Sequence, residues 1–125
     1  MSDKRHILGQ AGEDFAEDYL RSQGYQILEK NYRSHFGEID IIAQEDETIC
    51  FVEVRAKTTD WHGHPLESIS IHKKRRLIKT AFFYLQSQDS LDQWVRFDVV
   101  GLNSKDNGDY EVDLIKNAFE LEEVP

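Results

Sequence analysis

Two acidic side chains stand inside β-rich apolar runs, where a charge is costly unless it is paired, hydrated or bound to a cation. Asp40 interrupts the run at residues 39–42, and Glu53 interrupts the run at residues 51–56. Two carboxylates held close together repel each other, which raises a pKa or requires a cation. A hard divalent ion such as Mg2+, bound by one or two carboxylates with water and phosphate, would relieve that repulsion.

The stretch from 37 to 57 predicts a β-hairpin, because two β-rich segments flank a short acidic turn. If Asp46 and Glu47 form a two-residue loop, the pairing places Asp40 opposite Glu53. Opposed Cβ atoms in an antiparallel pair lie roughly 4.5–5.5 Å apart. A loop of odd length would instead send the two carboxylates to opposite faces of the sheet.

The first helix is predicted over about residues 7–23, where apolar residues recur at intervals of three and four. Gly24 suits the position that follows a helix. Glu13 falls at the edge of the apolar arc, so it can reach the rim of a site beside the core. Periodicity alone favours the alternative, an ordinary solvated glutamate. A weakly alternating strand over residues 25–32 follows.

A second helix is predicted from a cap at Ser68 or Ser70 to about residue 86. Its expected buried stripe is Ile71, Ile78, Ala81, Phe82 and Leu85. The basic residues expected to project away from that stripe are Lys73, Lys74, Arg76 and Lys79. Composition leaves two interpretations of these cations open: a solvated face, or contacts with a phosphate backbone.

Strands are predicted over residues 93–102 and 110–115, with an Asn/Gly/Asp turn between them. The order α-β-β-β-α-β-β therefore indicates one α/β domain spanning residues 1–125, with a central mixed sheet flanked by a helix on each face. An acidic tail begins at about Glu120. His62 and His64 lie in the loop before the second helix, where loop packing is a better interpretation than metal binding.

Composition narrows the function classes. The net charge of −9 counts against a protein that coats nucleic acid. The single cysteine, Cys50, excludes an internal disulfide framework and fits a packed thiol in the reducing cytoplasm. No apolar run approaches the roughly 18 residues of a membrane span, and the polar N-terminus is not a signal peptide.

The chain resembles the restriction-endonuclease-like superfamily, whose metal site has the form PD-(D/E)-x-K. More closely, it resembles the YraN-like family of predicted bacterial endonucleases, relatives of archaeal Holliday-junction resolvases. The resemblance spans nearly the whole chain and implies a restriction-endonuclease-like fold. Each short motif is weak alone, but the ordered set is specific. The carriers are residues 9–13 with Ala16, 24–25, 31–33, 37–42, 51–55, 74–77 and 96–100.

The resemblance implies a metal site of Asp40, Glu53 and the Val54 carbonyl oxygen, with Glu13 as the helix-borne carboxylate. Glu38 matches the family motif and is expected to support this site from the second layer.

One departure from the superfamily pattern concerns catalysis. Arg55 occupies the usual lysine position, two residues after the glutamate. Arginine stays protonated and cannot act as a base, although it can neutralise a phosphate or a transition-state charge. Lys57 shares its face of the strand and would orient water or contact the scissile phosphate.

The leading hypothesis is that the protein is a Mg2+- or Mn2+-dependent endonuclease acting on DNA, with branched DNA as a candidate substrate. In this hypothesis the basic helix positions the DNA backbone, and junction cutting would suit a homodimer. One alternative is a nuclease-fold module that binds nucleic acid or a protein partner without cutting. A third is an acidic scaffold protein in which Asp40 and Glu53 only form ion pairs.

Overall fold

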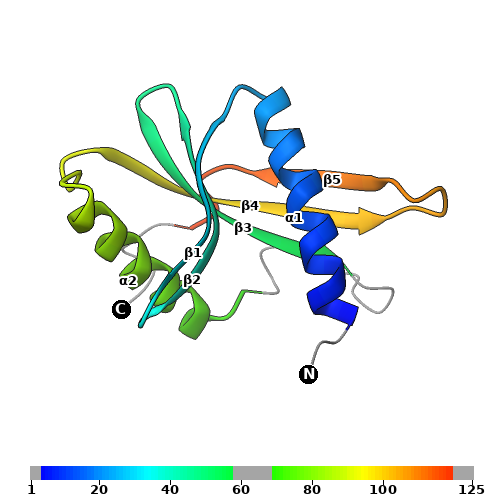
Figure 1. Cartoon of the computed structure of the whole chain (residues 1–125), viewed down its shortest axis with the longest axis horizontal. Helices are drawn as coiled ribbons and strands as arrows, with labels where there is room; N and C mark the ends of the chain where they lie inside the picture. The colour runs from blue at the N-terminus through cyan, green and yellow to red at the C-terminus, as the bar shows by residue number, and fades with distance from the viewer. Residues whose placement is uncertain (1–3, 58–68, 120–125) are drawn as a thin grey trace.

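The computed structural model describes residues 4–57 and 69–119, and the side chains from residue 10 onward within those ranges except that of Lys57. The predicted acidic tail and the loop with His62 and His64 lie outside the described residues. The elements are α1 (Lys4–Ser22), β1 (Gln26–Ser34), β2 (Gly37–Glu45), β3 (Thr48–Lys57), α2 (Ile71–Ser87), β4 (Trp94–Ser104) and β5 (Tyr110–Ile115) (Figure 1).

The predicted α/β class and element order are confirmed. The sheet has five strands in the order β1-β2-β3-β4-β5. It is mixed, because β3 and β4 run parallel and every other neighbouring pair is antiparallel. A parallel pair needs a crossover connection, and the segment that contains α2 provides it.

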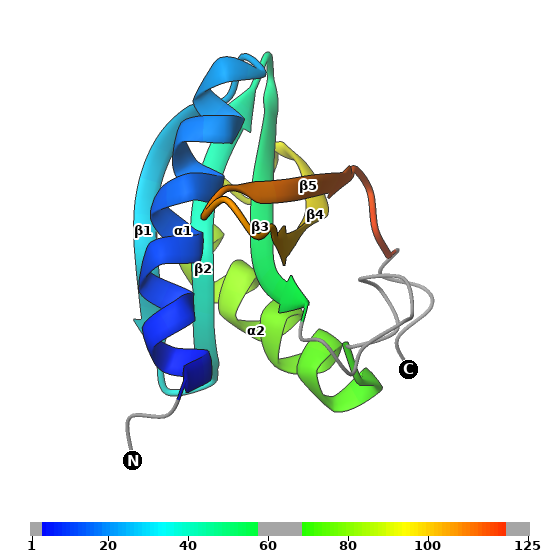
Figure 2. The same ribbon diagram turned by 90° about the vertical axis from the view of Figure 1, so that its right-hand side faces the viewer.

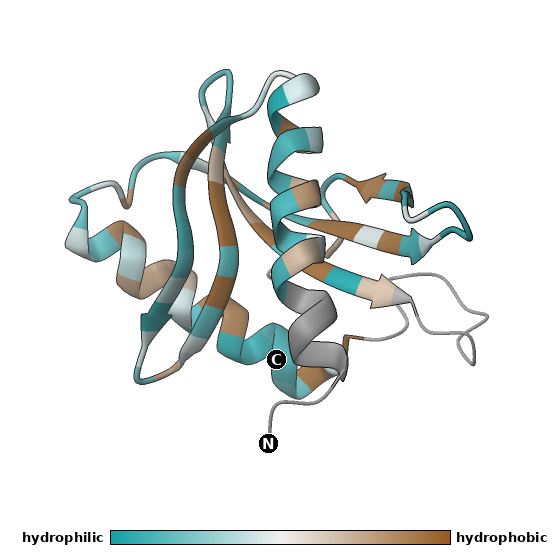
Figure 3. Ribbon diagram, turned by 45° about the vertical axis from the view of Figure 1, so that its right-hand side comes forward, coloured by the Kyte–Doolittle hydropathy of each residue, from teal (hydrophilic) through white to brown (hydrophobic). Residues whose placement is uncertain are grey.

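Each helix packs on its own face of the sheet, as predicted (Figures 1 and 2). On β3, Val52 belongs to the core under α1, whereas Phe51 belongs to the core under α2. This is the alternation of a strand covered on both faces. In α1, Ala16 and Leu20 are fully buried. Figure 3 shows that the outward turns of α1 are largely hydrophilic, while apolar residues run along the middle of the sheet.

The central hairpin has the predicted register. Glu45 pairs with Thr48, which leaves Asp46 and Glu47 as a two-residue turn. Asp46 adopts a left-handed φ of 54°, a conformation that aspartate tolerates better than most residues. The even loop length keeps the apolar side chains of β2 and β3 on their core faces.

The N-terminus of α2 was predicted correctly, but part of its buried stripe was wrong. Ser70 is the cap, and its side chain accepts a hydrogen bond from the Lys73 N–H. Phe82 is 49% exposed and Ile71 38% exposed, whereas Leu77 and Tyr84 are buried. Because residues 77–85 are apolar around most of the helix, periodicity permits two neighbouring faces. Packing against the sheet selects one of them.

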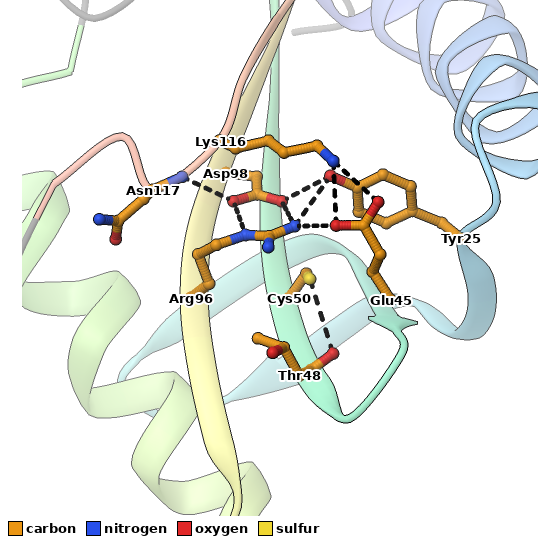
Figure 4. Close-up of polar contacts among 8 residues, drawn as sticks. All are labelled: Tyr25, Glu45, Thr48, Cys50, Arg96, Asp98, Lys116 and Asn117. Carbon is orange, nitrogen blue, oxygen red and sulfur yellow. Dashed lines mark hydrogen bonds and ion pairs between the residues drawn. The ribbon is translucent and has the colours of Figure 1, made fainter.

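A buried polar network fixes the hairpin turn to the first half of β4 (Figure 4). Asp98 is 1% exposed. It accepts hydrogen bonds from the Tyr25 hydroxyl at 2.9 Å and from Arg96 Nε at 2.8 Å. Arg96 also donates to Glu45 at 2.8 Å, and Glu45 pairs with Lys116 at 2.8 Å. Four segments distant in sequence are thereby tied together, and the buried charges have partners.

Strand β4 continues two residues beyond its predicted end, because Ser104 pairs with Tyr110 of β5. Cys50 is fully buried, and burial raises the pKa of its thiol to about 12, consistent with the packed thiol predicted. Within the described residues, neither helix is long and apolar enough to cross a membrane.

Candidate active site

The backbone ladder between β2 and β3 ends next to the predicted acidic pair. Ile41 and Val52 form its last pair. Beyond them, the Asp40 carboxylate accepts a hydrogen bond from the Val54 N–H at 2.8 Å. A side-chain oxygen thus satisfies a strand N–H that the ladder does not pair, and the two strands diverge from this point (Figure 1). The divergence makes room for polar side chains between two otherwise apolar strands.

The structure brings the carboxyl groups of Asp40 and Glu53 together, as the hairpin register predicts. Burial, the negative charge of Glu53 and a hydrogen bond with the Glu53 carboxyl raise the pKa of Asp40 well above its usual value. The hydrogen bond from the Val54 N–H acts in the opposite direction but does not prevail. The two acidic groups therefore compete for ionisation, which is the situation that a cation resolves.

Among the described side chains, those of Lys73 and Arg55 contact Glu53. It is 4% exposed, and its Oε2 lies 2.7 Å from Nζ of Lys73 and 3.5 Å from a terminal nitrogen of Arg55. Lys73 comes from the first turn of α2, across the sheet face. Of these two cations, the one nearer to Glu53 therefore comes from a helix rather than from the same strand.

Glu13 approaches the pair from α1. Close packing helps to position it, because a Cβ added at Gly12 would lie 3.0 Å from the Leu102 Cδ1 atom of β4. Burial, followed by the charges of Glu38 and Glu53, raises the pKa of Glu13. The negative charges of Glu38 and Glu53 therefore act on the Glu13 carboxyl group.

Asn31 connects Glu13 to Glu38. With its amide nitrogen directed toward them, it donates to Glu13 at 2.8 Å and to Glu38 at 3.3 Å. It lies within β1 and has a left-handed φ of 53°, a conformation that asparagine tolerates. Glu38 also forms an exposed ion pair with Arg33 at 3.1 Å. Glu38 thus accepts from the same amide that donates to Glu13, and its supporting role at the site stays a prediction.

The acidic side chains around Asp40 offer oxygen ligands for a metal ion, but few of them lie close to a single point. Within the described residues, no three side chains from His, Cys, Asp and Glu gather closely enough to hold a metal ion. Asp40 and Glu53 supply two carboxylates, and the carbonyl oxygen of Val54 faces the same strand edge as its N–H. Because Mg2+ usually keeps several waters and one or two carboxylates, the pair fits a hydrated hard cation.

The predicted phosphate-binding residues do not form one exposed row. Lys73 contacts Glu53, and Nζ of Lys74 lies 5.4 Å from the centre of the Phe119 ring. Arg76 and Lys79 are exposed on α2. The backbone of Lys57 continues β3, and its side chain lies outside the described residues.

Comparison with known proteins identifies the family. A family model described as "Uncharacterised protein family UPF0102" matches residues 12–102. The chain belongs to this family. The matched segment includes both the hairpin and α2, so it contains every carboxylate and amide of the cluster described above.

Several UPF0102 relatives match along almost their whole length. A protein of Persephonella marina is 49% identical over 116 residues, covering 93% of this chain and 96% of the relative. One of Desulforapulum autotrophicum is 40% identical over 122 residues, covering 98% and 100%. Among solved structures, Pyrococcus furiosus SfsA in complex with Ca2+ matches with a TM-score of 0.40 and 15% identity. That match covers 92% of this chain and 64% of the SfsA chain.

UPF0102 membership confirms the YraN-like resemblance at the level of the family. The relation to PD-(D/E)-x-K nucleases is not part of that finding and stays a prediction, as do the roles expected for the site residues.

Two residues of the site in this UPF0102 chain have positions that sequence reasoning did not identify. Lys73 was predicted to contact phosphate, with no indication that it contacts Glu53, because the pairing depends on how α2 is rotated against the sheet. Asn31 appeared only among the family-like residues. Its one signal was a residue of low strand propensity inside a predicted strand.

Proposed function

We propose that this UPF0102 protein is a divalent-metal-dependent endonuclease that hydrolyses phosphodiester bonds of DNA. The observation that carries the proposal is the Asp40–Glu53 pair. Two carboxyl groups meet where β2 and β3 diverge, and the pKa of one is raised partly by the charge of the other. Carboxyl groups whose pKa is raised by burial and by a specific charged neighbour cluster at functional sites, and the geometry of this pair agrees with the superfamily resemblance.

Asp40, Glu53 and the Val54 carbonyl would hold one Mg2+ or Mn2+ ion. When bound, such an ion polarises a phosphodiester oxygen and lowers the pKa of a coordinated water. Glu13, fixed by Asn31, would reach the ion through a bound water. Glu38 would hold Asn31 and Glu13 in place. In this proposal the direct ligands come from two strands, and a helix adds a contact through water.

Arg55 and Lys57 would stabilise negative charge rather than remove protons. Arg55 lies beside Glu53, and its guanidinium stays protonated at any physiological pH. It would therefore neutralise charge that develops on the phosphate. Lys57, two residues further along β3, would orient water or contact the phosphate.

The substrate proposal follows from where positive charge is available. Arg76 and Lys79 are exposed on α2, the helix that brings Lys73 to Glu53, so they would contact the DNA backbone, with Lys74 beside them. With a net charge of −9, binding would be confined to this helix rather than spread over the surface. Branched DNA cut by a cytoplasmic homodimer is the form of this proposal closest to the family resemblance.

The experiment is cleavage of plasmid, flap and four-way-junction DNA with Mn2+ by the wild type and by Asp40→Ala and Glu53→Ala. Wild-type cleavage should fall about a hundredfold or more in each variant, because each change removes a metal ligand. Asp92→Ala is the matched control on an exposed aspartate and should leave cleavage unchanged. Activity that persists in both site variants would exclude the proposal.

A nuclease-fold module that grips DNA without cutting it is the second candidate. The observation that favours it is the Lys73–Glu53 ion pair, which already neutralises one carboxylate of the proposed metal site, together with Arg55 at the usual lysine position. This module would show salt-sensitive DNA binding with no need for a divalent ion. Metal-stimulated turnover by the wild type would exclude it.

A further inference from the structure

Lys73 reaches the carboxylate pair from a different element than the sequence pattern indicates. Its Nζ lies 2.7 Å from Oε2 of Glu53, while Arg55, the residue at the usual lysine position, lies at 3.5 Å. The Glu53 side chain is 4% exposed, whereas that of Lys73 is 33% exposed. One end of this ion pair is therefore buried, and the other is reachable from solvent.

The backbone at Lys73 is fixed by the start of α2. Its N–H donates to the Ser70 hydroxyl at 3.1 Å, and the next N–H donates to the Ser70 carbonyl at 3.0 Å. Ile69, just before the cap, is 5% exposed and anchors this end of the helix. The origin of the side chain is thus rigid, while its four-carbon stem can move the ammonium by several ångströms.

We propose that Lys73 is an exchangeable counterion: it neutralises Glu53 in the metal-free protein, and it binds a DNA phosphate once a divalent ion has taken its place at Glu53. A divalent ion attracts the two carboxylates more strongly than a single ammonium does. The displaced ammonium then needs another anion, and a phosphate of bound DNA supplies it. The proposal rests on the proposed metal site and adds a substrate contact made only in the metal-bound state.

A basic side chain on a long flexible stem suits this exchange. The Lys73 ammonium is a compact charge with freely rotating donors, so it can turn from one anion to another. The placement also explains how the site can have arginine at the usual lysine position of β3 and still have a lysine beside Glu53. Helix α2 supplies it from across the sheet face.

The first measurement is Mn2+ affinity, read from the electron paramagnetic resonance signal of free Mn2+. Lys73→Met should bind Mn2+ several-fold more tightly than the wild type, because it removes a competing cation. Lys73→Arg should differ little from the wild type. Lys105→Met is the charge-matched control: it removes one positive charge from the β4–β5 turn, which projects away from α2 (Figure 1).

The second measurement is DNA affinity, by fluorescence anisotropy, with saturating Mn2+ and with a chelator. With Mn2+, Lys73→Met should bind DNA several-fold more weakly than Lys105→Met, and Lys73→Arg should recover most of the loss. With the chelator, Lys73→Met and Lys105→Met should bind equally, because Lys73 is then occupied by Glu53. Circular dichroism of each variant checks that it is folded.

The outcomes separate this proposal from the endonuclease proposal. Mn2+ affinity that is unchanged or weaker in folded Lys73→Met overturns the exchange, as does a DNA-affinity loss of equal size with and without Mn2+. A wild type that binds no Mn2+ overturns both proposals. A wild type that binds Mn2+ and DNA but cuts none of the substrates overturns the endonuclease alone, since neither measurement above depends on cleavage.

Discussion

At the scale of single residues, the site places charge where a stable core would have none. The Asp40 carboxyl is held beside Glu53 with its pKa raised well above the usual value, first by burial and then by the Glu53 charge. At neutral pH the metal-free protein must either protonate one group or keep two adjacent charges. A buried carboxyl group whose pKa is raised by a neighbouring carboxylate is typical of functional sites.

Asp40→Asn should therefore stabilise the metal-free protein at neutral pH, by roughly 1 kcal/mol. The amide oxygen can still accept the Val54 N–H, and its nitrogen can donate to Glu53, so the repulsion is removed while both contacts remain. Urea unfolding measures the change, with Asp92→Asn as the exposed control. Mn2+ should raise the melting temperature of the wild type and leave that of Asp40→Asn unchanged. A variant that is less stable than the wild type without metal would contradict this account of the pair.

The meeting of Asp40 and Glu53 was predictable because strand pairing follows simple counting from a two-residue turn. The contact between Glu53 and Lys73 was not predictable from the sequence. Lys73 reaches it only because α2 crosses the sheet face at one rotation, and the apolar segment at residues 77–85 permits more than one. Local rules fix contacts along a hairpin, whereas helix-to-sheet packing depends on the whole core.

At the scale of elements, the hairpin is held at its turn and opens at its other end. The polar network around Asp98 fixes the turn end to β4 and to the segment after α1 (Figure 4). The pairing of β2 with β3 stops at Ile41 and Val52. A firmly held turn allows the strands to diverge at the site without loss of register. The network and the site thus have separate roles in one hairpin.

Asp98→Ala should lower the free energy of unfolding by about 3 kcal/mol, because the Tyr25 hydroxyl and Nε of Arg96 lose their buried acceptor. Urea denaturation measures this, and Asp106→Ala in the exposed β4–β5 turn is the control. Mn2+ affinity of the folded fraction should stay as in the wild type. A loss below about 1 kcal/mol would show that the network does not hold the hairpin.

Glu45 should give the network a dependence on acidic pH. Hydrogen bonds from Lys116 and Arg96 lower the pKa of Glu45 below its usual value. Its contribution is therefore complete above the pKa of the unfolded chain, about 4.3, and is lost as the pH falls through the lowered folded value. Glu45→Gln should cost about 1 kcal/mol at neutral pH, and this difference should shrink on acidification. Unfolding curves at neutral pH and near pH 4 test this, and a difference that grows in acid would refute it.

At the scale of the whole molecule, the sequence predicts more of the architecture than of the site. The order of helices and strands follows from periodicities, caps and turns, and the structure agrees with it to within a few residues at each boundary. The site needs three elements to converge: α1 brings Glu13, the hairpin brings the carboxylate pair, and α2 brings Lys73. Their convergence depends on how both faces of the sheet pack, which no local pattern contains.

The overall charge should make DNA binding weak and sensitive to salt. The net charge is −9, and in the proposed complex DNA contacts only the cations of α2, so few counterions would be released on binding. Replacing Arg76 and Lys79 by Met should weaken binding about equally across DNA sequences and reduce the slope of log affinity against log salt by roughly 2. Anisotropy titrations at several salt concentrations measure the slope, with Lys105→Met as control. An unchanged slope would place DNA elsewhere on the protein.

The central claim is that Asp40 and Glu53 share one cation where β2 and β3 diverge. The most direct measurement is a crystal structure with Mn2+, located by its anomalous scattering. The account predicts a peak within about 2.5 Å of both carboxylates and the Val54 carbonyl oxygen, with the Lys73 ammonium displaced from Glu53. A crystal without Mn2+ at this place, in which Lys73 still contacts Glu53, would contradict it.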